Sequence, residues 1–390
     1  MKTPEPLIPR PGGGGSGGMT AQVIALPGGV MPAAQRYASL AGTVGDGVQL
    51  HPKDLEVYAG EAPSPDYSIQ TEVEAVARFA DSLGLSRFHL LGYSGGGFVS
   101  LAFAGAHPER LLSLGLFEPA SIPGELSAEE AGIYRRLDEE LAGKSGPEFM
   151  RSFVTLHVKE GVELPPPAGP PPPWMSKRPA GLAAMMKAFS AHPFDREWLR
   201  RCEFPVFLGY GDLTGVHEEI RAGILARLLP DLHIRRFAGI HHFVAPEEIY
   251  SPDHVAALHA LWARANEGVI RKFYELFGKQ ELDRAAALFT EAAEFHMPGS
   301  NAISGTHRGR DAILAFWRRQ LELSHGSFKT RMVSMKPKGD HIAVTLDVSS
   351  EVEGEQTAWR RTVDYRIGGG LIAEATVAES DQAVADRLFA

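Results

Sequence analysis

A serine set between glycines is the first residue in this chain whose surroundings suggest chemistry. Ser94 lies in the string Gly92-Tyr93-Ser94-Gly95-Gly96, which matches the pattern G-x-S-x-G. The run before it, Arg87–Leu91, predicts a strand, and the small residues of Gly95–His107 predict a helix. A serine on a sharp strand-to-helix turn needs flanking glycines, because a Cβ would clash there. This context predicts that Ser94 is the nucleophile of an acyl transfer reaction.

A serine hydroxyl needs a base that takes up its proton. Two adjacent histidines, His241 and His242, lie in the string GIHHF, just after an expected strand at His233–Phe237. We expect one of them to face Ser94 and the other to be a loop or core residue. We favour His242 as the base and keep His241 as the alternative.

The base in turn needs a carboxylate that orients it. Asp212 follows the expected strand Phe204–Tyr210, and ligands of open parallel sheets bind at the carboxyl ends of strands. A chain order of serine, then acid, then histidine is typical of enzymes with this motif. Asp212 is therefore the expected acid. Glu118, at the end of the strand Leu111–Phe117, is the alternative, in which case Asp212 would be a turn or helix-capping residue.

Acyl transfer also requires hydrogen-bond donors for the oxyanion that develops on the carbonyl oxygen. The backbone N–H of Gly95 directly follows the nucleophile and is one expected donor. We expect the second donor in the loop Leu26–Val30, at Gly29. The alternative for this loop is a simple tight turn, and the two interpretations are compatible.

The elements around these residues alternate between strand and helix. The apolar run Ala21–Leu26 ends in a Pro-Gly-Gly turn, as a buried parallel strand would. Apolar residues then recur at steps of three and four from Ile69 to Leu83, which predicts an amphipathic helix. Further helices are expected near Glu218–Leu229 and at Asp253–Ala265. This alternation predicts a parallel sheet with helices on both faces.

Two segments depart from this alternation. From about residue 119 to 201 the pattern breaks, and the stretch Pro165–Trp174 (PPPAGPPPPW) should be irregular or polyproline-like, which favours an inserted lid. Residues 1–18 are rich in proline and glycine, so we expect a flexible leader or linker there. Met19 is then the expected natural start.

A second pattern begins near Glu267. Apolar residues form helical stripes at Val269–Phe277 and Ile313–Leu321. The period then changes to two at Ile342–Val348 and Trp359–Ile367, as in long antiparallel strands. The chain should therefore consist of a first domain at 19–265 and an α+β domain at 267–390.

The bulk composition excludes several classes of function. The net charge of −9 argues against a nucleic-acid or anionic-membrane surface. A single cysteine, Cys202, rules out an internal disulfide and a multi-cysteine metal site. We find no signal peptide or apolar run long enough to span a membrane, so we expect a cytoplasmic protein. The chain also lacks HExxH and P-loop motifs, and after the glycine-rich leader it has no G-x-G-x-x-G, so we expect no metal and no cofactor.

Residues 19–265 resemble the α/β-hydrolase superfamily, in the branch with a lid between the sixth and seventh strands. The strings that carry the resemblance are Phe88–Pro119 around the serine and Gly239–Glu248 around the histidines. In the family the base is commonly followed by an aromatic or small residue, which favours His242. The oxyanion loop departs from the family because it lacks the usual His-Gly. The first two family strands have no room after Met19, so the resemblance implies a sheet of about six strands.

Residues 267–390 resemble the SnoaL-like polyketide cyclase and ketosteroid isomerase group, which has the nuclear-transport-factor-2-like fold. The strings Val269–Trp317 and Gly368–Phe389 carry this resemblance. The fold hosts cyclases, isomerases, hydratases and inert binding modules, so it specifies no activity. The expected polar residues of its cone-shaped pocket are His296, Asn301, His307 and Asp381. The alternative is that His296 ends a strand, His307 lies in a loop and Asp381 caps the last helix.

Together these features predict a serine hydrolase that cleaves an ester, thioester, lactone or activated carbon–carbon bond of a small apolar molecule. The alternatives are a binding or scaffolding protein without turnover, and a cyclase or isomerase acting in the C-terminal domain. The expected partner is a small-molecule substrate rather than nucleic acid or a membrane. The resemblance of the second domain also implies a possible homodimer through that domain.

Overall fold

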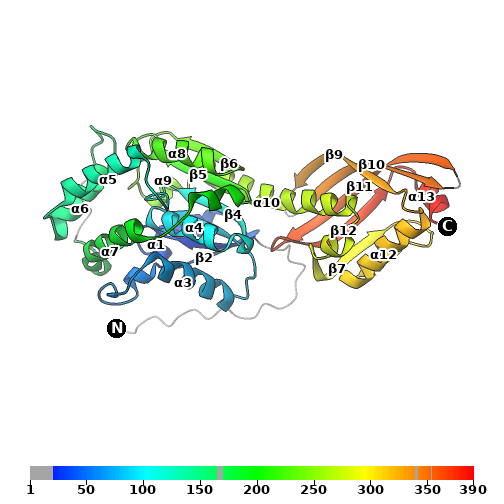
Figure 1. Ribbon diagram of the computed structural model, residues 1–390, viewed down its shortest axis with the longest axis horizontal. Coiled ribbons are helices and arrows are strands. Elements are labelled where there is room, and N and C mark those ends of the chain that lie inside the picture. Colours follow the sequence, from blue (N-terminus) through cyan, green and yellow to red (C-terminus); the bar gives the residue numbers. More distant parts are fainter. Residues whose placement is uncertain (1–20, 165–169, 339–340, 353) are drawn as a thin grey trace.

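The computed structural model describes residues 21–164, 170–338, 341–352 and 354–390. It contains two lobes joined by one long helix (Figure 1). The predicted leader at residues 1–18, and residues 165–169 of the proline-rich stretch, lie outside the described residues. Residues Pro173–Lys177 at the end of that stretch form a short 3-10 helix, η3.

The N-terminal domain is built on a sheet of six parallel strands in the order β2-β1-β3-β4-β5-β6. The expected parallel sheet of about six strands is therefore confirmed. One strand, β2, was not expected, because its residues VQLHP lie at the sheet edge and are only partly buried. The strands are β1 (Ala21–Leu26), β2 (Val48–Pro52), β3 (Phe88–Tyr93), β4 (Leu111–Phe117), β5 (Val206–Gly211) and β6 (Leu232–Phe237).

Helices cover both faces of this sheet, and each face has its own hydrophobic core. In β1, Ile24 packs into one core and Val23 into the other, because successive strand residues point to opposite faces. One core contains residues of α3 (Ile69–Ser82), α4 (Gly95–Ala106) and α8 (His217–Leu228). The other contains residues of α1 (Ala33–Arg36), α2 (Ala38–Thr43), α9 (Pro246–Ile249) and α10 (Pro252–Gly278).

The segment between β4 and β5 is largely helical. It contains α5 (Ala128–Leu141), α6 (Gly146–Leu156) and α7 (Arg178–Ala191), followed by the 3-10 helix η4 (Arg196–Arg201). Ser127 begins α5 with a capping box, in which its hydroxyl and the Glu130 carboxylate each accept a backbone N–H of the other residue. The lid helices bury a small apolar cluster of their own, which consists of Leu141, Phe149, Phe153 and Leu182.

A single helix, α10, runs from the first lobe into the second. We expected a helix ending at Ala265 and a new stripe from Val269, whereas the structure has 27 continuous helical residues. The apolar spacing explains the continuity. Leu258, Leu261 and Trp262 belong to the first core, and Ile270 and Phe273 continue the steps of three and four into the next core.

The C-terminal domain is α+β, as expected, with a mixed six-stranded sheet in the order β8-β7-β12-β11-β10-β9. Its apolar face packs against the end of α10 and against α11 and α12, around Phe273, Trp317 and Tyr365. The strands are β7 (Phe289–Met297), β8 (Gly305–Arg308), β9 (Lys329–Lys338), β10 (His341–Val352), β11 (Glu355–Gly368) and β12 (Leu371–Glu379). The helices are α11 (Leu282–Ala286), α12 (Arg310–Leu323) and α13 (Gln382–Leu388).

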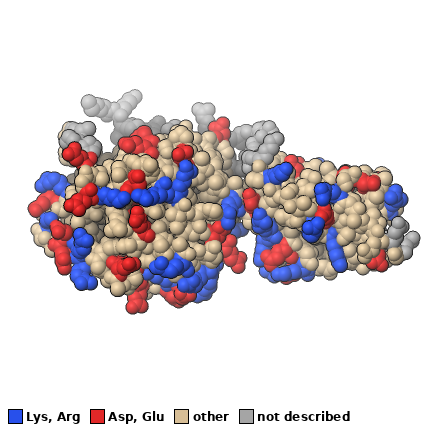
Figure 2. Space-filling model, turned by 90° about the horizontal axis from the view of Figure 1, so that it is seen from above, with Lys and Arg blue, Asp and Glu red and all other residues tan. Residues whose placement is uncertain are grey.

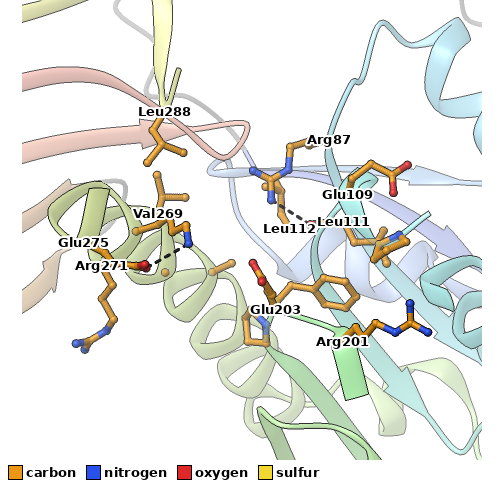
Figure 3. A pocket seen from close by; sticks show the side chains of 16 residues that line it. Arg87, Glu109, Leu111, Leu112, Arg201, Glu203, Val269, Arg271, Glu275 and Leu288 are labelled. Atoms are coloured by element: carbon orange, nitrogen blue, oxygen red, sulfur yellow. Dashed lines mark hydrogen bonds and ion pairs between the residues drawn. The ribbon is translucent and has the colours of Figure 1, made fainter. Parts of the chain in front are cut away.

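The two lobes meet at the amino ends of β3, β4 and β5. A crevice of about 650 Å³ lies there, with Arg87, Leu111 and Arg201 on one wall and residues of α10 on the other (Figure 3). The turn between β11 and β12 touches the first lobe, because a Cβ on Gly370 would overlap the Leu112 side chain. Ser94 follows the opposite, carboxyl end of β3, so the second lobe does not cover it.

Basic and acidic side chains are intermixed on the face seen in Figure 2, and the two lobes are separated there by a narrow waist. No helix among the described residues is long and apolar enough to cross a membrane.

Candidate active site

Ser94 occupies a strained turn between β3 and α4. Its φ of 52° and ψ of −118° are unusual for a residue with a side chain. The glycines around it are needed because other backbone lies close. A Cβ on Gly96 would overlap the Pro27 carbonyl oxygen, and one on Gly92 would lie 2.7 Å from the Gly96 oxygen. The glycine pattern therefore reflects close packing of Gly96 against the end of β1 and of Gly92 against the first turns of α4.

The side chain of His242 lies against Ser94. Its Nε2 atom is 3.0 Å from the Ser94 Oγ atom, and both residues are nearly buried. The ring of Tyr93 stacks on the imidazole of His242, with ring centroids 5.1 Å apart. The Tyr93 hydroxyl also donates a hydrogen bond to the His242 carbonyl oxygen. The neighbouring His241 instead accepts a hydrogen bond from the Phe243 N–H through its Nδ1 atom.

Glu118 is the carboxylate beside His242. Its Oε2 atom lies 2.6 Å from the His242 Nδ1 atom, and the residue is completely buried. The other oxygen, Oε1, accepts hydrogen bonds from the Gly211 N–H at 2.7 Å and from the Thr214 hydroxyl at 2.6 Å. Glu118 has a φ of 45°, so the chain turns at the end of β4 and directs this side chain inward.

The expectation for Asp212 needs correction, because the structure does not bring this residue to His242. The Asp212 carboxylate accepts a hydrogen bond from the Gly239 N–H at 2.7 Å and so ties β5 to the turn after β6. It therefore has the turn role that the sequence left open for it. Both Asp212 and Glu118 follow a strand at its carboxyl end, but β4 lies directly beside β3 and Ser94, whereas β5 lies one strand further away.

The burial of His242 and Glu118 changes the pKa of both side chains. Burial lowers the pKa of His242, and the guanidinium groups of Arg36 and Arg221 lower it further. Burial raises the pKa of Glu118, and the hydrogen bonds from Thr214 and Gly211 oppose that rise. A neutral imidazole with a free Nε2 lone pair is the form that a general base needs.

The two glycines expected to bind an oxyanion lie next to each other. The side of Gly95 on which a Cβ would stand is 3.7 Å from the Gly29 nitrogen. Neither the Gly29 nor the Gly95 N–H donates a hydrogen bond to any of the described residues. The loop carrying Gly29 is fixed by two tyrosines: Tyr58 donates to the Gly29 carbonyl oxygen at 2.5 Å, and Tyr37 donates to the Leu26 oxygen at 2.6 Å.

The lid helix α7 covers these glycines. A Cβ on Gly95 would overlap the Met185 Cε atom, and one on Gly29 would overlap the Leu182 Cδ2 atom. Leu182 also belongs to the apolar cluster of the lid, against which Val30, Met186 and Phe243 pack. Apolar side chains of α7 therefore lie over the two glycines beside Ser94.

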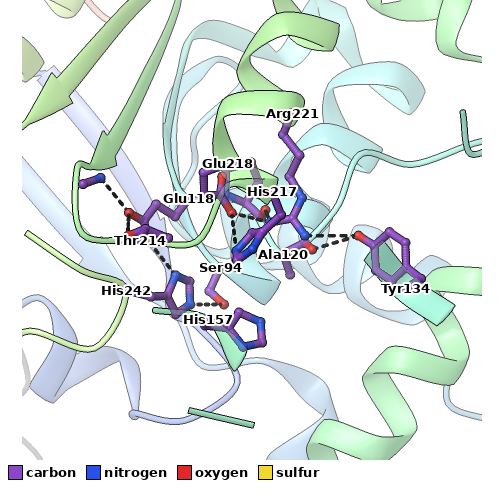
Figure 4. A network of polar contacts seen from close by, with 12 residues as sticks. Ser94, Glu118, Ala120, Tyr134, His157, Thr214, His217, Glu218, Arg221 and His242 are labelled. Carbon is purple, nitrogen blue, oxygen red and sulfur yellow. Dashed lines mark hydrogen bonds and ion pairs between the residues drawn. The ribbon is translucent and has the colours of Figure 1, made fainter. Parts of the chain in front are cut away.

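A second set of buried polar residues adjoins Glu118 (Figure 4). Arg221 pairs with Glu218, and it donates to the Pro119 carbonyl oxygen at 3.1 Å. Tyr134 of the lid helix α5 donates to the Ala120 carbonyl oxygen at 3.0 Å. Because the Ala120 N–H donates in turn to the Ser94 carbonyl oxygen, at 2.9 Å, this network fixes the chain between the serine turn and the lid.

The four residues expected in the C-terminal pocket do not meet there. His296 contacts Thr306, with Glu294 and Glu374 close to its ring, and is partly exposed. Asp381 caps α13, and Asn301 donates to Asp386. His307 stacks on Phe316 with ring centroids 4.4 Å apart, and its Nε2 faces the Ile303 carbonyl oxygen.

Aromatic side chains fill the interior of the cone instead. The remaining cavity is about 20 Å³, which is enough for about one water molecule. Its polar lining comes from Gln320, Thr330, Arg361 and the hydroxyl pair of Tyr274 and Tyr365, whose oxygens are 2.6 Å apart. This cavity, as the described residues line it, is too small for an organic substrate.

Two family descriptions match the chain. Residues 52–198 match the alpha/beta hydrolase fold family, and residues 270–375 match the SnoaL-like domain family. The six-stranded parallel sheet and the mixed sheet agree with these two matches. The chain joins an α/β-hydrolase domain to a SnoaL-like domain.

Among curated proteins, the chain is similar to the monoacylglycerol lipases abhd6-A and abhd6-B of Xenopus laevis. They are 35% and 34% identical to it over 86 residues, which cover 19% of this chain and 26% of each relative. The chain thus matches about a quarter of the length of these relatives.

Among solved structures, the hydrolase domain is similar to a carboxylesterase of the thaumarchaeon Nitrososphaera gargenis. Identity is 14% and the TM-score 0.49, with 64% of this chain and 92% of that chain covered. The SnoaL-like domain is similar to Bal32a from a soil-derived mobile gene cassette. There the identity is 23% and the TM-score 0.31, with 32% and 96% covered.

Several residues around Ser94 had no sequence signal that would have singled them out. The hydrolase domain brings Tyr58, Tyr93 and His157 to this site from a 3-10 helix, a strand and the lid. Glu118 did have a signal, since it ends a strand, but so did Asp212.

Proposed function

We propose that the protein is a serine hydrolase that cleaves carboxylic esters with an apolar acyl group. The observation that carries the proposal is the buried chain of contacts from Ser94 Oγ through His242 to Glu118, with distances of 3.0 Å and 2.6 Å. A hydroxyl, an imidazole and a carboxylate in this order form the arrangement that activates a serine. The match of part of the chain to two lipases fits the same reaction.

The reaction would proceed in two steps, acylation of Ser94 and hydrolysis of the acyl-enzyme. Ser94 Oγ attacks the ester carbonyl carbon while its proton moves to His242 Nε2, and Glu118 stabilises the imidazolium that forms. The Gly29 and Gly95 N–H groups donate to the oxyanion. The intermediate then expels the alcohol, which takes the proton from His242, and leaves an acyl group on Ser94. Water, deprotonated by His242, cleaves that acyl-enzyme to release the acid and restore Ser94.

The apolar lining supports an aliphatic acyl group. Leu182 and Met185 of α7 lie over the two glycines, and Leu182 belongs to the apolar cluster of the lid. Each buried methylene of an acyl chain contributes about 0.8 kcal/mol of binding free energy. Activity should therefore rise with the length of the acyl chain as more of its methylenes contact these side chains.

Two measurements test the proposal. A fluorophosphonate should label the wild-type protein at Ser94, and Ser94→Ala should abolish labelling. The same change should lower kcat for p-nitrophenyl butyrate by at least about 10³-fold without changing the melting temperature by more than a few degrees. Near wild-type esterase activity of a folded Ser94→Ala protein would contradict the proposal.

A further inference from the structure

A second histidine, His157, lies beside the Ser94–His242 pair but takes no part in the reaction described above. Its ring centroid is 5.3 Å from that of His242, and its side chain is drawn next to Ser94 in Figure 4. It follows the last residue of the lid helix α6. The ring therefore lies where a substrate bound at Ser94 would contact it.

The position of His157 is fixed by the backbone around it. Its carbonyl oxygen accepts a hydrogen bond from the Gly215 N–H at 3.2 Å, and the Lys159 N–H donates to the Leu213 oxygen at 2.9 Å. Val158 and Thr214 form an isolated β-bridge between these two contacts. Since Thr214 also holds Glu118, the lid segment with His157 is anchored to the same loop as the carboxylate.

The tautomer of His157 follows from its hydrogen bond. The Nδ1 atom lies 2.7 Å from the Phe153 carbonyl oxygen, which can only accept, so Nδ1 carries the proton. Burial lowers the pKa of His157 to about 3, and the nearby His242 and Arg221 contribute to that shift. The ring is therefore neutral around pH 7, and Nε2 is a hydrogen-bond acceptor without a proton.

This acceptor is free for a ligand. Nε2 of His157 has no hydrogen-bond partner among the described residues. Unlike Nε2 of His217, which is completely buried without a partner, Nε2 of His157 retains some access to its surroundings. The ring otherwise contacts apolar aromatic groups, with the centroid of Phe153 at 4.4 Å and that of Phe243 at 5.9 Å. A nearly buried acceptor in apolar surroundings gains most from a donor that arrives with the substrate.

We infer that His157 selects esters whose alcohol part carries a second hydroxyl group, which donates a hydrogen bond to His157 Nε2. The inference rests on the proposed ester hydrolysis. His242 must reach the leaving oxygen of the alcohol to protonate it, so a group beside His242 meets the alcohol part and not the far end of the acyl chain. A hydroxyl fits better than an ammonium group, because a cation would lose its hydration among the aromatic rings.

A matched pair of substrates measures this selection. 2-Hydroxyethyl hexanoate and propyl hexanoate differ by a hydroxyl in place of a methyl group at the end of the alcohol. Wild-type kcat/KM should be about tenfold or more higher for the hydroxylated ester. His157→Phe keeps an aromatic ring but removes the acceptor, so the ratio of the two kcat/KM values should fall to near one.

Two further variants keep the test decisive. His157→Gln retains an acceptor and should keep part of the preference, which a purely structural role of the ring would not predict. His192→Phe changes another lid histidine, at the end of α7, and should leave the ratio as in wild type. If the ratio is near one in wild type, or survives His157→Phe, the inference is wrong while ester hydrolysis stands. If no ester is cleaved in a Ser94-dependent way, the proposed function fails and this inference fails with it.

Discussion

Replacing Glu118 by glutamine gives a sharp test of the site, because the surrounding donors dictate how the new amide must lie. The Gly211 N–H can only donate, so the oxygen of the introduced amide has to remain at the position of Oε1. The amide NH₂ group then faces His242 Nδ1. That nitrogen must become the acceptor, which moves the imidazole proton to Nε2, towards Ser94, where it cannot take up the serine proton.

The expected loss can be estimated from this change of tautomer. An imidazole held in the wrong tautomer lowers kcat by about 10⁴-fold in serine enzymes, which corresponds to about 5.4 kcal/mol of activation free energy. A flipped amide would restore the tautomer but would place NH₂ against the Gly211 N–H, at a cost of about 1–3 kcal/mol, which corresponds to about 5- to 160-fold. The neutral amide oxygen would also stabilise the imidazolium less than a carboxylate does. We therefore expect a loss between about 10²- and 10⁴-fold for Glu118→Gln.

The assay compares Glu118→Gln with Asp212→Asn, the matched change at the other strand end. Rates of fluorophosphonate labelling and of p-nitrophenyl butyrate hydrolysis should be measured on protein whose folding is checked by its melting curve. Asp212→Asn keeps an oxygen for the Gly239 N–H and should lose less than about tenfold. The reasoning is refuted if Glu118→Gln stays within tenfold of wild type, or if Asp212→Asn is the more damaging change.

Three other perturbations test the base, the domain boundary and the acid sensitivity of the fold. His242→Ala should lower the labelling rate by at least about 10³-fold and His241→Ala by less than about tenfold; the reverse ranking would move the base to His241. A fragment of residues 19–265 contains Ser94, His242 and Glu118, so it should label at the rate of the full chain per folded molecule; a folded fragment that does not label would mean that the SnoaL-like domain completes the site. The third perturbation concerns His89, whose pKa is lowered by burial to about 3. From about pH 6.5 down to pH 5 the unfolded chain binds a proton there and the folded chain does not, so the free energy of unfolding falls as the pH falls, by up to about 1.4 kcal/mol per pH unit. In urea unfolding at pH 5, 6 and 7, His89→Asn should reduce the pH dependence of the free energy of unfolding by up to that amount. An unchanged pH dependence would show that His89 does not cause the acid sensitivity.

The architecture was largely determined by the sequence. Apolar runs predicted four strands of the first sheet, because buried parallel strands consist of nearly continuous apolar residues. The signal is weaker at the two sheet edges: β6, with four exposed residues, was still expected, whereas the partly buried β2 was not. The change of period after Glu267 predicted the α+β domain. It did not reveal that α10 continues across the junction. Apolar residues recur at steps of three and four on both sides of residue 266, and this spacing is the same for one long helix and for two separate helices.

The position of Ser94 was also determined by the sequence. A serine turn at the end of a strand demands glycines at Gly92 and Gly96, and this local requirement appears directly as a motif. The contact of His242 with Ser94 involves residues 148 positions apart, and the motif itself says nothing about it. The sequence therefore left open which of His241 and His242 lies beside Ser94, and in the structure it is His242.

The identity of the neighbouring carboxylate was decided by tertiary structure alone. Glu118 and Asp212 occupy equivalent places in the pattern, each after a parallel strand. What separates them is strand order, since β4 lies beside β3 while β5 lies one strand further, together with the inward turn of the chain at Glu118. The sequence specifies which residues end strands because that is a local matter of hydrophobic pattern. Which of those residues meet depends on the order in which the strands pair, and that is set by contacts between distant parts of the chain.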